Sequence, residues 1–304
     1  MTPLNYLRNA IPDALKSADY YRKETPEYAS KVLEILNEAK VAPKFVMPDN
    51  GKIFDDQLRG LPDDFRLPYP SIVIEYVCRL EGGLVEDKFG SDATHAAPER
   101  IIYAQQTDEN SILVASVICI HARGRKFWTV QPFIAEIIPS AFLSDADKAR
   151  LYVDPFCSGS KRINQAVNIM HDLGGRAFKD FGQKWEEHAF YDMNDECNAV
   201  LELIEALSCS NVSHEALPVR KPNKSAFKRG ALPFDEYRIL TVRSSVAGKD
   251  GIPIVLPFDR RTPREHLRRG HIRTLKDGRR IWVNSTVVNA HVGSRITKDY
   301  RMAA

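Results

Sequence analysis

Two spacings of apolar residues alternate along the chain, with a helical spacing near the start and again over residues 194–208 and a strand-like spacing in the block between them. Thr25 and Pro26 form a typical helix start, and the apolar face that follows consists of Tyr28, Val32, Ile35, Leu36 and Ala39. A second helix is predicted over residues 194–208, with an apolar stripe made of Cys197, Val200, Leu201, Ile204 and Leu207. The opposite face, which we expect to be solvated, carries Glu196, Glu202 and Glu205.

The middle of the chain has the pattern of strands joined by short loops. Strand-like runs cover residues 71–80, 100–106, 111–120 and 126–138. The loops at 107–110 and 122–125 are short enough for hairpins, so an antiparallel meander is predicted. The run 112–118 is apolar throughout and is therefore predicted to be a central strand covered on both faces. A further strand is expected over residues 236–245.

These elements predict an α+β fold, in which an antiparallel sheet covered by helices is followed by a basic C-terminal unit with a β-hairpin. The expected division is an acidic α+β body over residues 1–213 and a basic unit over residues 214–304. Within the basic unit, a connector spans 214–235, and a strand and the hairpin occupy 236–304. The connector can also lie within one compact unit, so that the basic part and the body are not separate domains.

The charge is distributed unevenly along the chain. Residues 1–214 hold 23 Lys and Arg against 32 Asp and Glu, whereas residues 215–304 hold 20 against 8. A basic tail on an acidic body indicates an anionic partner for the tail, most often nucleic acid. The alternative is that the two halves neutralise each other within one fold.

Composition narrows the class of protein. Hydrophobic residues make up 43% and charged residues 27%, as in ordinary globular proteins. The longest apolar stretch is about half the length of a membrane span, and the first residues lack the pattern of a secretory signal. The five cysteines include no C-x-x-C pair, which is typical of reduced thiols. We therefore expect a cytoplasmic protein with no membrane partner, and neither a fibre nor a secreted disulfide scaffold.

Neither a metal nor a cofactor is expected. The GSK sequence at 159–161 lacks the first glycine of a phosphate-binding loop. His266 and His271 are five positions apart, but the two arginines between them would repel a divalent cation.

The most patterned segment lies near the C-terminus. Asp277-Gly278 is a strong signal for a hairpin with a two-residue turn. Pairing outwards from that turn predicts Arg273 opposite Trp282. Strand alternation then assigns to a core-facing side Ile272, Thr274, Ile281 and Val283. The polar side receives His271, Arg273, Leu275, Arg280, Trp282 and Asn284.

This segment predicts a nucleic-acid-binding surface. A tryptophan flanked by arginines on a strand can stack on a base while the guanidinium groups contact phosphates. The predicted binding residues are Arg268, Arg269, Arg273, Arg279, Arg280 and Trp282. The alternative is structural: Trp282 faces the rest of the protein, and Arg273 packs on its ring as a cation–π pair.

The leading hypothesis is therefore a non-enzymatic nucleic-acid-binding protein, with DNA and RNA both open. One alternative is a protein-interaction module that modulates a host protein through the acidic body. A second is a metal-free nuclease in which His266 and His271 act as acid and base.

The C-terminal sequence resembles a group of largely uncharacterised proteins from tailed bacteriophages and prophages of proteobacteria. The shared pattern is RGHIR at 269–273, GRRIWV at 278–283 and KDY at 298–300. The basic connector is also similar, with KPNK at 221–224 and KRG at 228–230. The resemblance implies a phage origin and a setting in the bacterial host cytoplasm. It implies no catalytic activity and no ligand.

Overall fold

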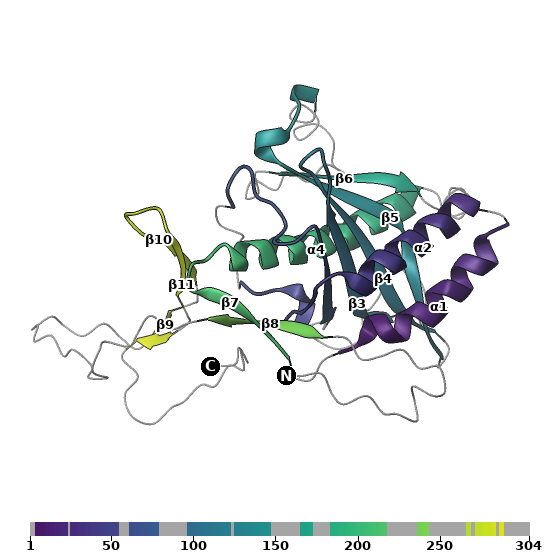
Figure 1. Cartoon of the computed structure of the whole chain (residues 1–304), viewed down its shortest axis with the longest axis horizontal. Coiled ribbons are helices and arrows are strands. Elements are labelled where there is room, and N and C mark those ends of the chain that lie inside the picture. Colours follow the sequence, from purple (N-terminus) through teal and green to yellow (C-terminus); the bar gives the residue numbers. More distant parts are fainter. Residues whose placement is uncertain are drawn as a thin grey trace, which may run out of the picture.

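The computed structural model describes residues 4–23, 25–54, 61–78, 96–122, 125–146, 165–172, 183–217, 236–242, 266–268, 271–283 and 286–288. Helices and strands combine in the α+β arrangement that the sequence predicts (Figure 1). The helices are α1 (Tyr6–Tyr21), α2 (Pro26–Val41), α4 (Gln183–Leu207) and the 3-10 turns η1 (Asp49–Gly51) and η2 (Ser140–Phe142). No helix in these ranges is long and apolar enough to cross a membrane.

Eight strands form one sheet. They are β1 (Lys44–Val46), β2 (Ser71–Val77), β3 (Ala96–Gln106), β4 (Ile112–Ala122), β5 (Arg125–Pro139), β6 (Gln165–Asp172), β7 (Val212–Ala216) and β8 (Tyr237–Val242). Their spatial order is β6-β5-β4-β3-β2-β1-β8-β7. Two separate pairs of strands follow near the C-terminus, formed by β9 (His266–Arg268) with β12 (Thr286–Val288) and by β10 (His271–Thr274) with β11 (Arg280–Val283).

The large sheet is mixed, which corrects the prediction of an antiparallel one. Strands β2 to β6 form an antiparallel meander. The short strand β1, however, lies parallel to both β2 and β8. A strand of three residues has no recognisable alternation, and its parallel neighbours lie far along the chain, so the local pattern predicts neither the strand nor its direction.

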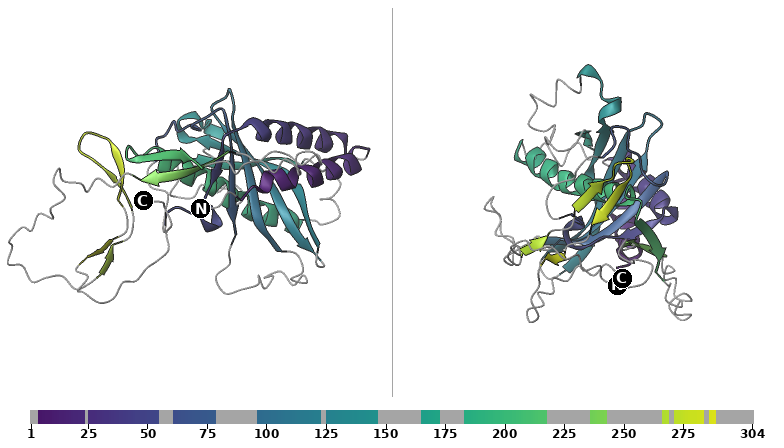
Figure 2. Two further views of the ribbon diagram at one scale, coloured as in Figure 1. Left: turned by 60° about the horizontal axis from the view of Figure 1, so that its bottom comes forward. Right: turned by 90° about the vertical axis from the view of Figure 1, so that its left-hand side faces the viewer.

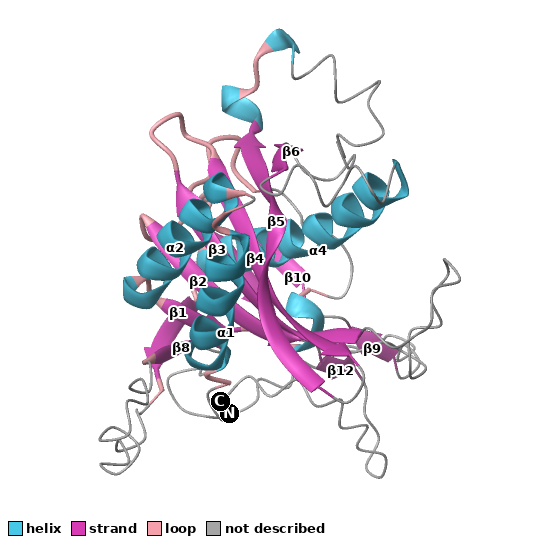
Figure 3. Cartoon of the chain, turned by 90° about the vertical axis from the view of Figure 1, so that its right-hand side faces the viewer, coloured by secondary structure: helices cyan, strands magenta, loops and turns pink. Residues whose placement is uncertain are grey.

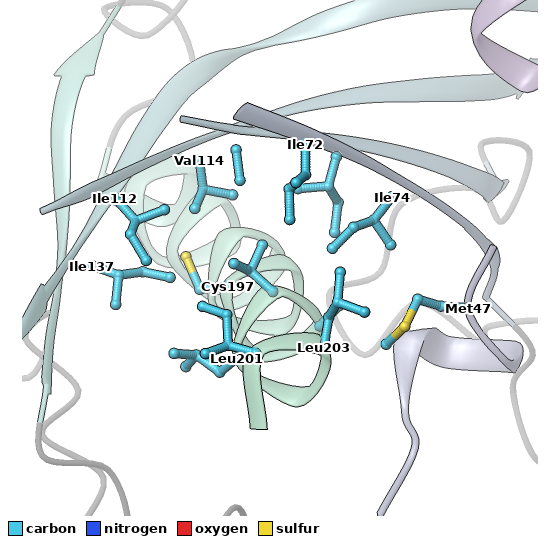
Figure 4. Packing of buried hydrophobic residues seen from close by; sticks show 14 of the residues in the cluster. Met47, Ile72, Ile74, Ile112, Val114, Ile137, Cys197, Leu201 and Leu203 are labelled. Carbon is cyan, nitrogen blue, oxygen red and sulfur yellow. The ribbon is translucent and has the colours of Figure 1, made fainter. Parts of the chain in front are cut away.

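The two faces of the sheet carry different helices, as Figures 1 and 3 show. Residues of α1 and α2 pack with Val73, Ile101 and Val117 in one buried cluster. Helix α4 packs on the opposite face with Ile72, Ile74 and other buried side chains of the strands (Figure 4). Successive residues of a strand point to opposite faces, so β2 contributes to both clusters in turn.

Buried Glu75 on β2 holds the start of α1 against the sheet. Its two carboxylate oxygens accept the backbone N–H groups of Tyr6 at 3.0 Å and Leu7 at 2.8 Å. The hydroxyl of Tyr237 on β8 donates to the same carboxylate at 2.8 Å. The N-cap residue Asn5 makes no capping side-chain bond, so Glu75 supplies the acceptor and the negative charge that a helix start favours.

The predicted boundary between residues 213 and 214 falls inside β7. That strand pairs with β8 from Val212↔Val242 to Ala216↔Arg238, and both strands belong to the sheet of the body. The remaining connector, 218–235, lies outside the described residues. The basic C-terminal part therefore contributes β8 to the same sheet as the N-terminal strands.

Candidate nucleic-acid interface

The acidic face of α4 is buried, which corrects the expectation of a solvated face. The exposed fractions of Glu196, Glu202 and Glu205 are 1%, 6% and 0%. The Glu196 carboxylate pairs with Arg100 of β3 at 3.3 Å. The other two carboxylates bind the segment around η1 and the β10–β11 hairpin. Helix α4 is therefore covered on a second side, and each of these charges anchors another part of the chain.

Glu202 fixes the backbone that follows η1. One of its oxygens accepts the N–H groups of Ile53 and Phe54, each at 2.8 Å. Burial raises the pKa of this carboxyl from its ordinary value of 4.5 to about 7, and nearby Glu205 adds to the rise. The two N–H donors favour the charged form and limit the shift.

Glu205 holds the C-terminal hairpin through Arg280. Nη2 of Arg280 lies 2.6 Å from the Glu205 carboxylate, and the exposed fractions of the two side chains are 13% and 0%. Nη1 donates to the Ser208 hydroxyl at 2.8 Å. In the backbone, the N–H of Ser210 donates to the carbonyl of Arg280 at 2.8 Å. Arg280 is thus an internal anchor in this structure and does not belong to the exposed surface of the hairpin.

Trp282 completes the docking of the hairpin. Its side chain is 8% exposed, and its ring centre lies 4.6 Å from that of Phe54. The Asn211 side-chain amide forms two hydrogen bonds with the backbone of Trp282: it accepts the N–H at 2.7 Å and donates to the carbonyl at 2.8 Å. The alternative in which Trp282 faces the protein therefore describes this structure, although its ring partner is Phe54 and not Arg273.

The hairpin register differs by one residue from the predicted one. Thr274 pairs with Arg280 and Ile272 with Trp282. The N–H of Leu275 donates to the carbonyl of Arg279 at 2.8 Å, and the N–H of Gly278 donates to the carbonyl of Leu275 at 3.0 Å. The loop thus has three residues, with Gly278 at a φ of 83°, as in a type I turn followed by a glycine bulge.

Because of this shift, residues that were predicted to lie on opposite faces of the hairpin share one face. Ile272 and Thr274 lie with Trp282 and Arg280, and that side meets the body. Arg273 and Arg279 alternate to the other side and are exposed. Figure 2 shows the hairpin, in yellow, beside the green β7 and β8.

Three cationic side chains are exposed on the hairpin: Arg273, Lys276 and Arg279. Arg279 forms an ion pair of 2.7 Å with Asp277 of the same loop. Hydrogen bonds from Arg279 lower the pKa of the Asp277 carboxyl, and the pKa of Arg279 rises in return. The bond orients the guanidinium and leaves it in solvent.

The other predicted site residues are placed only in part. Arg268 ends β9, where it pairs with Thr286 of β12. Arg269 lies outside the described residues. His266 is on β9 and His271 is on β10, which belong to two separate two-stranded sheets.

Sequence reasoning missed one polar cluster, formed by Tyr69, His214 and Arg238. Nη1 of Arg238 donates to the Tyr69 hydroxyl and contacts Nε2 of His214 at 3.0 Å. These residues come from the proline-rich loop, β7 and β8. No sequence signal joins them, because positions so far apart in the chain meet only in the folded sheet.

Within the described ranges, no group of three or more His, Cys, Asp or Glu side chains could hold a metal ion. Comparison with known proteins gives no further assignment: no family model, no curated protein and no solved structure matches the chain.

Proposed function

We propose that this protein binds nucleic acid without cleaving it, as an accessory protein of a bacteriophage that acts in the cytoplasm of the bacterial host. The observation that carries the proposal is the two-sided hairpin. Arg280 and Trp282 hold one side on the body, whereas Arg273 and Arg279 are exposed on the other side. The phage setting comes from the resemblance of the C-terminal sequence.

The two exposed arginines occupy diagonal positions across the hairpin. Arg273 pairs with Ile281, and Arg279 precedes Ile281 by two residues on the neighbouring strand. Diagonal partners of this kind are about 7–8 Å apart at the backbone, within reach for long side chains. Two guanidinium groups on one face, with Lys276 at the loop, give a surface that can contact successive phosphates.

The same geometry favours binding over catalysis and backbone contacts over base contacts. Arginine stays protonated in proteins and therefore contributes charge and hydrogen bonds without transferring a proton. Trp282 packs on Phe54, so base stacking by this ring is not part of the proposal. We expect weak dependence on nucleotide sequence, because phosphate contacts carry no sequence information directly.

Binding to labelled single-stranded DNA, duplex DNA and single-stranded RNA, measured by anisotropy at low salt with chelator present, tests the proposal. The R273A/R279A double variant should lose affinity for each ligand that the parent binds. The matched control is K16A/R22A, which removes two exposed cations, Lys16 on α1 and Arg22 directly after its end, and should bind like the parent. Folded parent protein that binds none of the three would overturn the proposal.

The same samples test the nuclease alternative. Cleavage of the RNA in chelator, lost in His266→Ala or His271→Ala, would replace binding with metal-free catalysis. For the protein-interaction alternative, the burial of Glu196, Glu202 and Glu205 removes three carboxylates from the surface that it requires.

A further inference from the structure

Three side chains that are distant in the sequence meet on the α4 face of the sheet, near its β7 edge. On β8, Arg238 is aligned with Phe45 of β1 and Ala216 of β7. His214 is two residues from Ala216, so it shares that face. Tyr69 comes from the loop before β2, and the Phe45 ring lies 6.2 Å from the Tyr69 ring and 5.9 Å from the His214 ring.

Tyr69 and His214 hold the guanidinium of Arg238 by one nitrogen. Its Nη1 donates to the Tyr69 hydroxyl and lies 3.0 Å from Nε2 of His214. The Tyr69 hydroxyl is also 3.0 Å from Nε2. An arginine N–H can only donate, so Nε2 accepts, and the imidazole is neutral with its proton on Nδ1. The guanidinium carbon stands 5.1 Å from the centre of the Tyr69 ring.

The opposite edge of this guanidinium is unused. Across the described part of the chain, Nε and Nη2 of Arg238 have no hydrogen-bond partner, and no carboxylate pairs with the side chain. Neither nitrogen is among the fully buried side-chain atoms that lack a partner, so solvent reaches both. Nε–H and Nη2–H are parallel donors whose spacing fits two oxygens of one phosphate or carboxylate group.

We propose that this edge of Arg238, oriented by Tyr69 and His214, binds a phosphate group. The charge of the sequence favours phosphate over a carboxylate ligand, because the segment 215–304, which contains Arg238, has 20 Lys and Arg against 8 Asp and Glu, and a basic segment attracts highly charged anions. The phosphate is either a free or small-molecule phosphate or a phosphate of a nucleic-acid backbone.

The phosphate site lies close to the β10–β11 hairpin, but phosphate binding at Arg238 does not require the hairpin. Strand β7 begins at Val212, directly after Asn211, whose amide holds Trp282. Figures 1 and 2 show β7 and the β10–β11 hairpin side by side. A nucleic acid on the hairpin could therefore extend along β7, but a small phosphate needs only the three side chains.

His214 provides a direct probe of the bound anion. Burial lowers the pKa of its imidazole, and the charge of Arg238 lowers it further. A phosphate on the outer edge of Arg238 would offset that charge, so the pKa of His214 should rise. Among the described residues, the charged and titratable groups in contact with the imidazole are Arg238 of β8 and Tyr69 of the loop before β2.

The test is an NMR titration of the intact protein with inorganic phosphate, with the His214 ring signal assigned by its loss in His214→Gln. We expect a saturable shift of that signal, a higher pKa at saturation, and a much weaker response to sodium acetate at equal ionic strength. No saturable shift, or an equal response to acetate, would overturn the proposal.

Two variants show whether the planar edge is the binding group. Arg238→Lys keeps the charge but lacks the two-donor edge, and should bind phosphate about tenfold more weakly or worse. Arg22→Lys, the matched control at an exposed arginine directly after α1, should bind phosphate like the parent. Tyr69→Phe keeps the ring, removes the hydroxyl that orients Arg238, and should also weaken binding. Equal affinity in Arg238→Lys, with the fold intact by amide spectra, would contradict the site.

Oligonucleotide binding by the same variants separates the two sources of phosphate. Loss of both phosphate and oligonucleotide affinity in Arg238→Lys would assign the site to a nucleic-acid backbone. Loss of phosphate affinity alone would assign it to a small phosphate ligand. The R273A/R279A variant should still show the phosphate-induced shift at His214, so failure of the hairpin surface and failure of this site are distinguishable.

Discussion

Glu205 of α4 and Arg280 of β11 form an ion pair of 2.6 Å in which the carboxylate is fully buried. The two residues are 75 positions apart, and their contact fixes the C-terminal hairpin on the helix that covers the large sheet. Removing one member of such a pair leaves an uncompensated buried charge. By fixing the hairpin on α4, the pair also fixes the orientation of the exposed side of the hairpin, which carries Arg273 and Arg279.

The first prediction concerns this anchor. Glu205→Gln should destabilise the docked hairpin by about 3 kcal/mol, because Arg280 keeps its charge and loses its carboxylate partner. Hydrogen exchange of the β11 amides should accelerate, including that of Trp282, whose N–H is bonded to Asn211. The control Glu109→Gln changes an exposed loop carboxylate and should leave exchange unchanged. Unaltered protection of β11 in Glu205→Gln would refute the anchor.

A second prediction concerns the start of α1. Glu75→Gln leaves one carbonyl oxygen where the carboxylate had two, so one of the Tyr6 and Leu7 N–H groups loses its acceptor. The expected loss in the free energy of unfolding is about 1–3 kcal/mol, measured by urea denaturation. The first amides of α1 should exchange faster while those of α2 do not. Equal stability of variant and parent would argue against the cap.

The raised pKa of Glu202 predicts how the free energy of unfolding changes with pH. Its pKa is raised in the folded protein from 4.5 to about 7, so the folded state binds the proton more tightly than the unfolded state. The stability that it contributes is complete below pH 4.5 and is lost as the pH rises through about 7. Relative to Glu202→Gln, the parent should lose about 3 kcal/mol across that window.

The measurement is the difference in unfolding free energy between parent and Glu202→Gln at several pH values, because other titrating groups cancel in the difference. The amide oxygen of glutamine can still accept the N–H groups of Ile53 and Phe54. A difference that is constant with pH, or that grows in favour of the parent as pH rises, would be inconsistent with a raised pKa.

Substitution of Gly278 tests the backbone conformation of the hairpin loop. Its φ of 83° lies in the left-handed region, and a Cβ added there would meet no atom within 4 Å. The cost of a side chain is therefore conformational: Gly278→Val should destabilise the hairpin by about 1 kcal/mol or more. Gly278→Asn, which tolerates positive φ, should cost less. Equal exchange rates of the hairpin amides in the two variants would contradict this loop geometry.

Local periodicity predicted the elements that are long and regular. The apolar stripe of α2 and the runs that became β2 to β5 follow from the residues nearby in sequence, and these elements were placed within a few residues of their ends. Strand β1 was missed because Lys44–Val46 is too short to show a period. The parallel direction of β1 depends on partners far along the chain.

The site depended on contacts that periodicity cannot show. The carboxylates of α4 form a regular polar stripe, and only the packing of η1 and the hairpin makes that stripe internal. Asp277-Gly278 is compatible with loops of two or three residues, and this one-residue choice moved Trp282 from the predicted polar side to the docked side. Tyr69, His214 and Arg238 meet only through the order of the strands.

The salt dependence of nucleic-acid binding shows whether Arg273 and Arg279 contact phosphates. For the parent and the duplex, the logarithm of the binding constant should fall linearly with the logarithm of salt concentration, with a slope of about −0.9 per neutralised phosphate. The R273A/R279A variant should show a slope less negative by about 1–2, whereas K16A/R22A should keep the parent slope. Identical slopes for the parent and R273A/R279A would contradict the assignment of the binding surface to the solvent side of the hairpin.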